Sequence, residues 1–123
     1  MRNFILTSLF LFLCLVPAGA EAARFSGAYL YQLCQMDKDG KEIVKGGHAA
    51  CQSYIAGVID YHLVLQSMKI APKIDICVPE KTPSAKLQAI VLKYLEKNNT
   101  HDGFVAAPAV TMALYEKYPC GKK

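Results

Sequence analysis

Histidine, cysteine and aspartate are the residue types in this sequence that could carry chemistry. The histidines, His48, His62 and His101, are far apart, and no HExxH zinc motif, GxSxG nucleophile motif or phosphate-binding glycine loop occurs. We expect His62 to be an exposed or half-buried helix residue. The sequence therefore predicts no metal site, no cofactor and no enzyme activity.

The cysteines give the strongest chemical signal in the chain. Cys14 lies in an apolar N-terminal segment, and the remaining cysteines are Cys34, Cys51, Cys77 and Cys120. An even number of cysteines in a small exported domain indicates two disulfides rather than a nucleophilic thiolate. Three pairings of four cysteines are possible, and the cysteines by themselves do not choose among them.

The first 20 residues predict a secretory signal peptide. Arg2 is followed by an apolar run over residues 4–16 and by small residues at 18–20. Cleavage after Ala20 fits this pattern, and cleavage after Ala22 fits it nearly as well. We therefore expect one periplasmic domain over residues 21–123, with no membrane contact after cleavage. The formal net charge is +4 and the lysines are scattered, so no nucleic-acid surface is predicted.

The stretch 51–68, CQSYIAGVIDYHLVLQSM, predicts the helix that positions the rest of the domain. Its apolar stripe is too wide for a helix with a single neighbour. The stripe consists of Cys51, Tyr54, Ile55, Val58, Ile59, Tyr61, Leu63, Leu65 and Met68. Gly57, in the middle of the helix, indicates the close approach of another backbone. Asp60 is expected to hydrogen-bond to a neighbouring loop, because an unpaired charge in an apolar helix is costly; a role in binding is the alternative.

Three further helices are predicted. A short one lies within residues 26–36, with Ser26 as its cap. Another begins at Thr82 and Pro83, because a capping hydroxyl followed by proline is typical of a helix start. Its apolar residues recur at helical spacing: Leu87, Ile90, Val91, Tyr94 and Leu95. The last begins near Asp102 or Pro108 and ends before Pro119.

The segments between these helices are polar or contain proline. Residues 37–49 and 97–104 are predicted loops, and residues 74–78 are a predicted extended segment between Pro72 and Pro79. Four helices with short connections pack most simply as antiparallel neighbours. This order favours the pairs Cys34–Cys51 and Cys77–Cys120, since each pair flanks one predicted helical hairpin. The sequence thus predicts a small all-α, four-helix domain with two disulfides.

The order of several short motifs resembles the Rap/Tai family of periplasmic immunity proteins. The matching pieces are Phe25-x-Gly27, Leu30-Tyr31-x-x-Cys34, Cys51-x-x-Tyr54-Ile55-x-Gly57-x-x-Asp60, Ile76-Cys77-Val78-Pro79, Val91-x-x-Tyr94-Leu95, and Ala113-Leu114 followed by Tyr118-Pro119-Cys120. They cover almost all of the chain after the signal peptide. Gly57, Asp60, Pro79 and the four cysteines match the scaffold positions of the family.

The resemblance implies a helical fold like that of the acid-stress chaperone HdeA, and a homodimer. It also implies that the protein binds a peptidoglycan amidase effector delivered by type VI secretion and occludes its active site. A periplasmic stress chaperone of the same fold is the alternative. The family motif does not fix the inhibitory contacts.

The loop between the last two predicted helices is the candidate for those contacts. It contains Asn98, Asn99, Thr100, His101 and Asp102, and it ends near Phe104. Polar loops held between two helices can fill the cleft of a partner, although an ordinary helix connection has the same composition. We expect this loop to contact the amidase.

Overall fold

The computed structural model describes residues 25–121, so the predicted signal peptide lies outside the described residues. Its elements are α2 (Gly27–Cys34), α3 (Gly47–Ser67), α4 (Ser84–Lys97), the short 3-10 helix η1 (Asn99–His101) and α5 (Ala107–Lys117). Between residues 25 and 121 there is no regular strand, only isolated bridges such as the one between Ile76 and Pro119. The prediction of an all-α fold with four α-helices is confirmed.

Different side chains hold the first N–H groups of α2 and α3. Ser26 caps α2, as predicted, because its Oγ accepts a hydrogen bond of 3.1 Å from the backbone N–H of Tyr29. Helix α3 begins at Gly47, earlier than the predicted start at Cys51. The carboxylate of Glu42 accepts the N–H groups of Gly46 and His48 at 2.9 and 3.3 Å, and this explains the earlier start.

Prolines mark the starts of the other two helices. Helix α4 has Pro83 at its N-cap position, and no side chain caps it, so the prediction that Thr82 is the cap is wrong. Pro108 lies in the first turn of α5, where a missing N–H costs nothing.

The two disulfides form between the pairs that the helix order favoured. Cys34 is bonded to Cys51 and ties the end of α2 to α3. Cys77 is bonded to Cys120 and ties the segment between α3 and α4 to the residues after α5. We call residues 68–83, which connect α3 to α4 and contain no helix, the strap.

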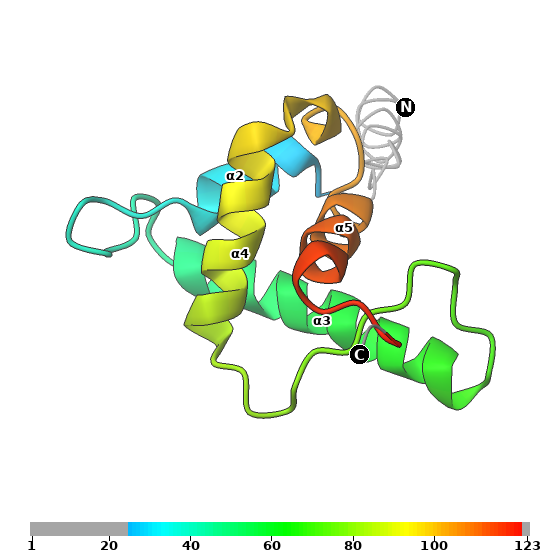
Figure 1. The fold of residues 1–123 in the computed structure, drawn as a ribbon. Helices are drawn as coiled ribbons and strands as arrows, with labels where there is room; N and C mark the ends of the chain where they lie inside the picture. The colour runs from blue at the N-terminus through cyan, green and yellow to red at the C-terminus, as the bar shows by residue number, and fades with distance from the viewer. Residues whose placement is uncertain (1–24, 122–123) are drawn as a thin grey trace, which may run out of the picture.

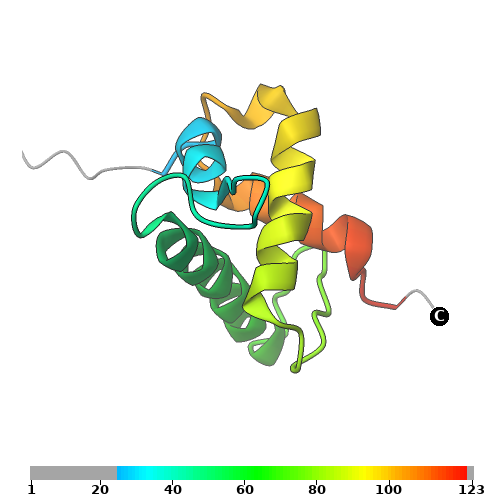
Figure 2. The same cartoon turned by 90° about the vertical axis from the view of Figure 1, so that its left-hand side faces the viewer.

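One apolar core lies where the helices meet. Helices α2, α4 and α5 each contact α3, and α4 also contacts α2 and α5. The largest fully buried core side chains include Leu30, Ile55, Val91, Val110 and Leu114. Figures 1 and 2 show α4 crossing the other helices on one side of the molecule.

Helix α3 is central over only part of its length. Cys51 and Ile55 are buried and face the core, as the wide stripe predicts. The C-terminal half of the helix extends beyond the other helices (Figure 1), and Tyr61, Leu63 and Met68 are 66%, 53% and 60% exposed. Their assignment to an inward-facing stripe is wrong, because none of the other helices within residues 25–121 lies over this part of α3 (Figure 1).

The close backbone contacts fall at glycines other than Gly57. Nothing lies within 4 Å of the position that a Cβ at Gly57 would take, so the predicted approach of a backbone there is wrong. A Cβ at Gly27 would overlap the carbonyl group of His101, and one at Gly47 would lie 2.7 Å from the carbonyl oxygen of Leu33. Glycine is therefore required at the starts of α2 and α3, and not in the middle of α3.

Candidate binding surface

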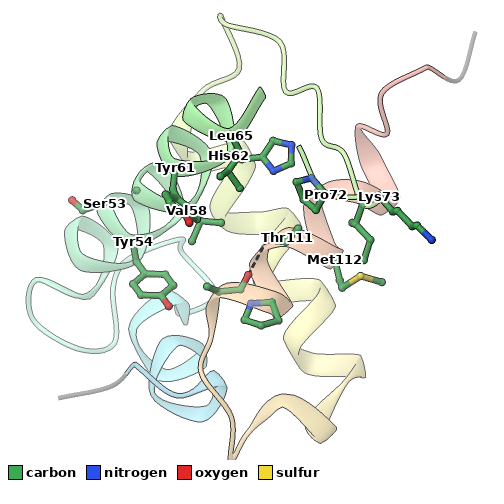
Figure 3. A pocket seen from close by; sticks show the side chains of 14 residues that line it. Ser53, Tyr54, Val58, Tyr61, His62, Leu65, Pro72, Lys73, Thr111 and Met112 are labelled. Atoms are coloured by element: carbon green, nitrogen blue, oxygen red, sulfur yellow. Dashed lines mark hydrogen bonds between the residues drawn. The ribbon is translucent and has the colours of Figure 1, made fainter. Parts of the chain in front are cut away.

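A groove of about 930 Å³ lies between α3, α5 and the strap. Figure 3 shows Val58, Tyr61 and Leu65 of α3 on one side of it and Met112 of α5 on the other. The remaining lining residues are Ser53, Tyr54, Gly57, His62, Pro72, Lys73, Ile74, Ala107, Pro108 and Thr111. Because Gly57 has no side chain, the groove is open along the middle of α3.

The chemistry of the groove suits contact with an apolar surface. Lys73 is the charged residue among its lining, and the hydroxyl of Thr111 donates a hydrogen bond of 3.0 Å to the carbonyl of Ala107 in its own helix. Small-molecule sites combine an apolar lining with a few convergent polar groups, and this groove has no such convergence. Residues 25–121 also contain no group of three potential metal-ligating side chains.

A buried histidine fixes the strap to α3. His62 is 5% exposed, and its Nε2 lies 2.7 Å from Oδ1 of Asp75 and 3.1 Å from the backbone N of Ile76. Nε2 of Gln66 donates to the same Asp75 oxygen at 2.7 Å and to the carbonyl of Ile76 at 3.0 Å. The prediction that His62 is exposed or half-buried is wrong, because the strap folds back over this side of α3.

The hydrogen bonds of this cluster depend on the proton of His62. One ring nitrogen can accept the N–H of Ile76 or donate to Asp75, but it cannot do both at once. Either arrangement ties the imidazole to the strap. The hydrogen bond from Gln66, and then that from His62, lower the pKa of Asp75, so this carboxyl is ionised at neutral pH.

An exposed apolar face continues from the groove. The C-terminal half of α3 and the strap carry the exposed large apolar residues Tyr61, Leu63, Val64, Met68, Ile70 and Ile74. We call these six residues the apolar face. Several large exposed apolar side chains on one part of a small domain are typical of a surface that contacts another protein.

The predicted contact loop lies at the other end of α4 from the apolar face (Figures 1 and 2). Hydrogen bonds hold its backbone to the start of α2: the N–H of Gly27 donates to the carbonyl of Phe104 at 2.9 Å, and that of Ala28 donates to the carbonyl of Asp102 at 3.2 Å. The loop therefore supplies acceptors that the first turn of α2 needs.

The side chains of this loop divide into two groups. Asn98 donates a hydrogen bond of 2.8 Å to the carbonyl of Tyr94, and His101 lies 3.3 Å from the Tyr94 hydroxyl, so both are used within the fold. Asn99, Thr100 and Asp102 are exposed. Phe104, at the end of the loop, is 71% exposed. The loop thus presents three polar side chains and one aromatic ring to solvent.

The two predicted scaffold residues Asp60 and Pro79 are at the surface. Asp60 is exposed, and none of the hydrogen bonds within residues 25–121 involves its carboxylate, so the predicted bond to a loop is not found. Pro79 is exposed in the strap, and its carbonyl accepts the N–H of Thr82 at 2.9 Å. It ends the extended part of the strap with a turn.

Two glutamines with structural roles were not identified from the sequence. Gln88 is 1% exposed, accepts a hydrogen bond from Gln52 at 2.8 Å and donates to the carbonyl of Cys34 at 2.9 Å. Its position beside Leu87, on the buried side of α4, was the available signal. Gln66 gave no such signal, because its partners belong to the strap.

The fold and these surfaces define a small disulfide-stapled helical protein with exposed surfaces suited to protein binding. The family model described as Rap1a immunity proteins matches residues 26–120, and the chain belongs to this family. No curated protein and no solved structure matches the chain. The family predicted from the sequence motifs is thereby confirmed, whereas the likeness to HdeA stays a prediction.

Membership of an immunity family implies a role against a secreted effector and therefore a cognate effector partner. Two disulfides are typical of proteins that fold outside the cytosol, which agrees with a secreted or periplasmic protein. None of the helices within residues 25–121 has the length and apolar character that crossing a membrane requires.

Proposed function

We propose that this chain is a periplasmic immunity protein that binds a peptidoglycan amidase effector delivered by type VI secretion and blocks its active site. The family match over residues 26–120 carries the proposal. On this proposal the protein acts by binding and performs no reaction, needs no cofactor, and reaches the periplasm through the cleaved signal peptide.

The loop from Asn98 to Phe104 is the proposed inhibitory element. Its backbone is held to α2 by two hydrogen bonds and its side chains to α4 by Asn98 and His101. A loop that is rigid before binding loses little entropy when it enters a cleft. Phe104 supplies an exposed aromatic ring, the kind of side chain that most often anchors a protein interface.

The proposed homodimer uses the apolar face and the groove beside it. The C-terminal half of α3 lies at the other end of α4 from the loop, so a second copy on the apolar face would leave the loop free for the effector (Figures 1 and 2). A second copy suits this surface because its exposed residues, on the C-terminal half of α3 and on the strap, are large and apolar.

Amidase inhibition by loop variants tests the inhibitory role. The oxidised protein is first used to capture a partner from periplasmic extract, and recovery of one amidase at near-equal amount supports the proposal. Phe104→Ala and the triple variant Asn99→Ala, Thr100→Ala, Asp102→Ala should each weaken inhibition at least about tenfold. Asn98 and His101 are left unchanged, because they hold the loop in place.

Ile43→Ala is the matched control, since Ile43 is also a large apolar residue on a loop and is 58% exposed. Its inhibition should equal that of the wild type. Full inhibition by both loop variants would reject the loop as the contact. Capture of many unrelated proteins, increasing at low pH, would instead favour the stress-chaperone function.

A further inference from the structure

The two disulfides have different environments. Cys34 and Cys51 are both 0% exposed and lie within the apolar core between α2 and α3. Cys77 is exposed, and Cys120 is half-buried. A thiol in solution can therefore approach the Cys77 end of the second disulfide, while the first is shielded by the packed helices.

A hydrogen-bond donor lies beside the other sulfur of the second disulfide. Nε2 of Gln66 is 3.6 Å from Sγ of Cys120 and is oriented as a donor to it. The same amide group is held by Asp75 at 2.7 Å and by the carbonyl of Ile76 at 3.0 Å. The amide has two hydrogens for these three acceptors, so the sulfur shares one of them in the disulfide. A thiolate on Cys120 would compete better for that hydrogen than a disulfide sulfur does, and a hydrogen-bonded thiolate leaves faster in disulfide exchange.

The exposed cysteine and the leaving group beside Gln66 thus belong to opposite ends of one bond. We propose that the Cys77–Cys120 disulfide is a site of thiol–disulfide exchange, which a dithiol reductant opens by attack at Cys77 while Cys34–Cys51 stays closed. This site is independent of the proposed amidase partner, because it follows from the burial of the sulfurs and the position of Gln66.

The exchange proceeds in two steps. A thiolate of the dithiol attacks Sγ of Cys77, a mixed disulfide forms, and the electron pair of the broken bond leaves on Sγ of Cys120 as a thiolate, which then takes a proton from water. The second thiol of the reductant loses its proton and attacks the mixed disulfide, which closes the reductant's own disulfide and releases Cys77 as a thiolate that takes up a proton. Two electrons and two protons pass to the protein, and the dithiol is oxidised.

Opening this bond removes the covalent tie of the strap. The strap and the C-terminal segment then remain joined by the hydrogen bonds from the N–H of Cys77 to the carbonyl of Tyr118, 2.8 Å, and from the N–H of Cys120 to the carbonyl of Asp75, 3.0 Å. Because the strap forms one wall of the groove, we expect reduction to increase amide hydrogen exchange in residues 70–79 and leave α2 and α4 unchanged.

Timed reduction of the native protein tests the site. The oxidised protein is treated with dithiothreitol, quenched with an alkylating reagent at intervals and analysed by peptide mass spectrometry, while circular dichroism confirms that the helices persist. Alkylation of Cys77 and Cys120 should proceed at least about tenfold faster than that of Cys34 and Cys51. Equal rates, or faster opening of the buried pair, would overturn the proposal.

A monothiol reports which sulfur is attacked. After incubation with glutathione and alkylation, the expected product carries glutathione on Cys77 and the alkyl group on Cys120. The opposite product would reject attack at Cys77. Gln66→Met keeps the side-chain length but removes the donor, so the preference for Cys77 should fall severalfold. An unchanged preference would reject the role of Gln66, and Gln52→Met, which changes an amide on another part of α3, is the control for the substitution.

Discussion

Among single residues, His62 adds a polar link between α3 and the strap beside the core residue Ile76. It is buried on α3 and contacts two consecutive strap residues, Asp75 and Ile76, through one ring nitrogen. A buried polar group that loses its hydrogen-bond partner costs free energy. Removing one member of this cluster therefore takes a hydrogen-bond partner from the remaining members and lowers the stability of the fold. Two predictions follow from this cluster.

Replacing His62 should destabilise the protein. His62→Leu fills the site with an apolar side chain but removes the hydrogen-bonding group that faces Asp75 and Ile76, so the free energy of unfolding should fall by about 1–3 kcal/mol. Tyr61→Phe is the matched control, because the neighbouring Tyr61 is 66% exposed, and its effect should stay within about 0.5 kcal/mol. Urea unfolding of both variants measures the difference. Equal stabilities would show that the strap does not depend on His62.

The charge of Asp75 should make stability depend on pH in acid. Its pKa is lower in the folded state, because Gln66 and then His62 hydrogen-bond to the ionised form. A carboxyl with a lowered folded pKa stabilises the fold fully above its unfolded pKa, about 4, and this contribution is lost as the pH falls through the folded value. The free energy of unfolding should therefore decrease on acidification below about pH 5.

Asp75→Asn separates this contribution from that of other carboxyls. The variant should be less stable than the wild type at neutral pH, and the difference should shrink as the pH falls. Asp60→Asn is the control for the substitution, since Asp60 is exposed and its carboxylate makes no hydrogen bond within residues 25–121. A difference between Asp75→Asn and the wild type that stays constant from pH 7 to pH 3 would contradict the assignment.

Among the elements, α2 and α3 both begin at a close contact with the backbone of another segment. The start of α2 packs directly on the carbonyl of His101, and the start of α3 packs on the carbonyl of Leu33. Both helices begin where the backbone of another element leaves no room for a side chain. The middle of α3, in contrast, is open to the groove.

Two glycine substitutions should therefore have opposite effects on stability. Gly27→Ala forces the backbone of the 98–104 loop away from α2, and the free energy of unfolding should fall by about 1–3 kcal/mol. Gly57→Ala adds a methyl group that meets nothing and favours the helix, so stability should rise by up to about 1 kcal/mol. Thermal and urea unfolding check both signs, and a destabilised Gly57→Ala variant would show that an unrecognised contact lies at this position.

For the whole molecule, the two disulfides add stability to a fold whose apolar core is small. They close segments of 17 and 43 residues, and in the chain-entropy treatment they contribute about 3 and about 4 kcal/mol. The apolar face nevertheless stays exposed on α3 and the strap. We expect a second copy of the chain to cover it.

Charge on the apolar face should separate the proposed dimer. Val64→Glu with Met68→Glu changes two residues that are 50% and 60% exposed, so the monomer should remain folded. Burial of unpaired carboxylates between two copies should raise the dimer dissociation constant at least about a hundredfold. Sedimentation equilibrium measures it, with Ala89→Glu on the exposed side of α4 as control. A monomeric wild-type protein, or an intact dimer of the double variant, would reject this surface.

The amino-acid sequence predicted the four helices, favoured the correct disulfide pairs and indicated the family. Apolar spacing and prolines are local signals, and each cysteine pair flanks one helical hairpin, so chain order was enough to favour the correct pairing. The family followed from short motifs in a fixed order, and the match over residues 26–120 confirms it.

Which residues of the apolar stripe on α3 are buried depends on the tertiary structure. Periodicity shows that Tyr61, Leu63 and Met68 are apolar, but exposure depends on whether another helix reaches them, and none does within the described chain. His62 is buried because the strap packs over it, and Asp75, a strap residue that it contacts, lies 13 residues further along the chain. Glycine is needed at Gly27 because of a carbonyl more than seventy residues away. Contacts between distant segments leave no local pattern, so only the folded chain could show them.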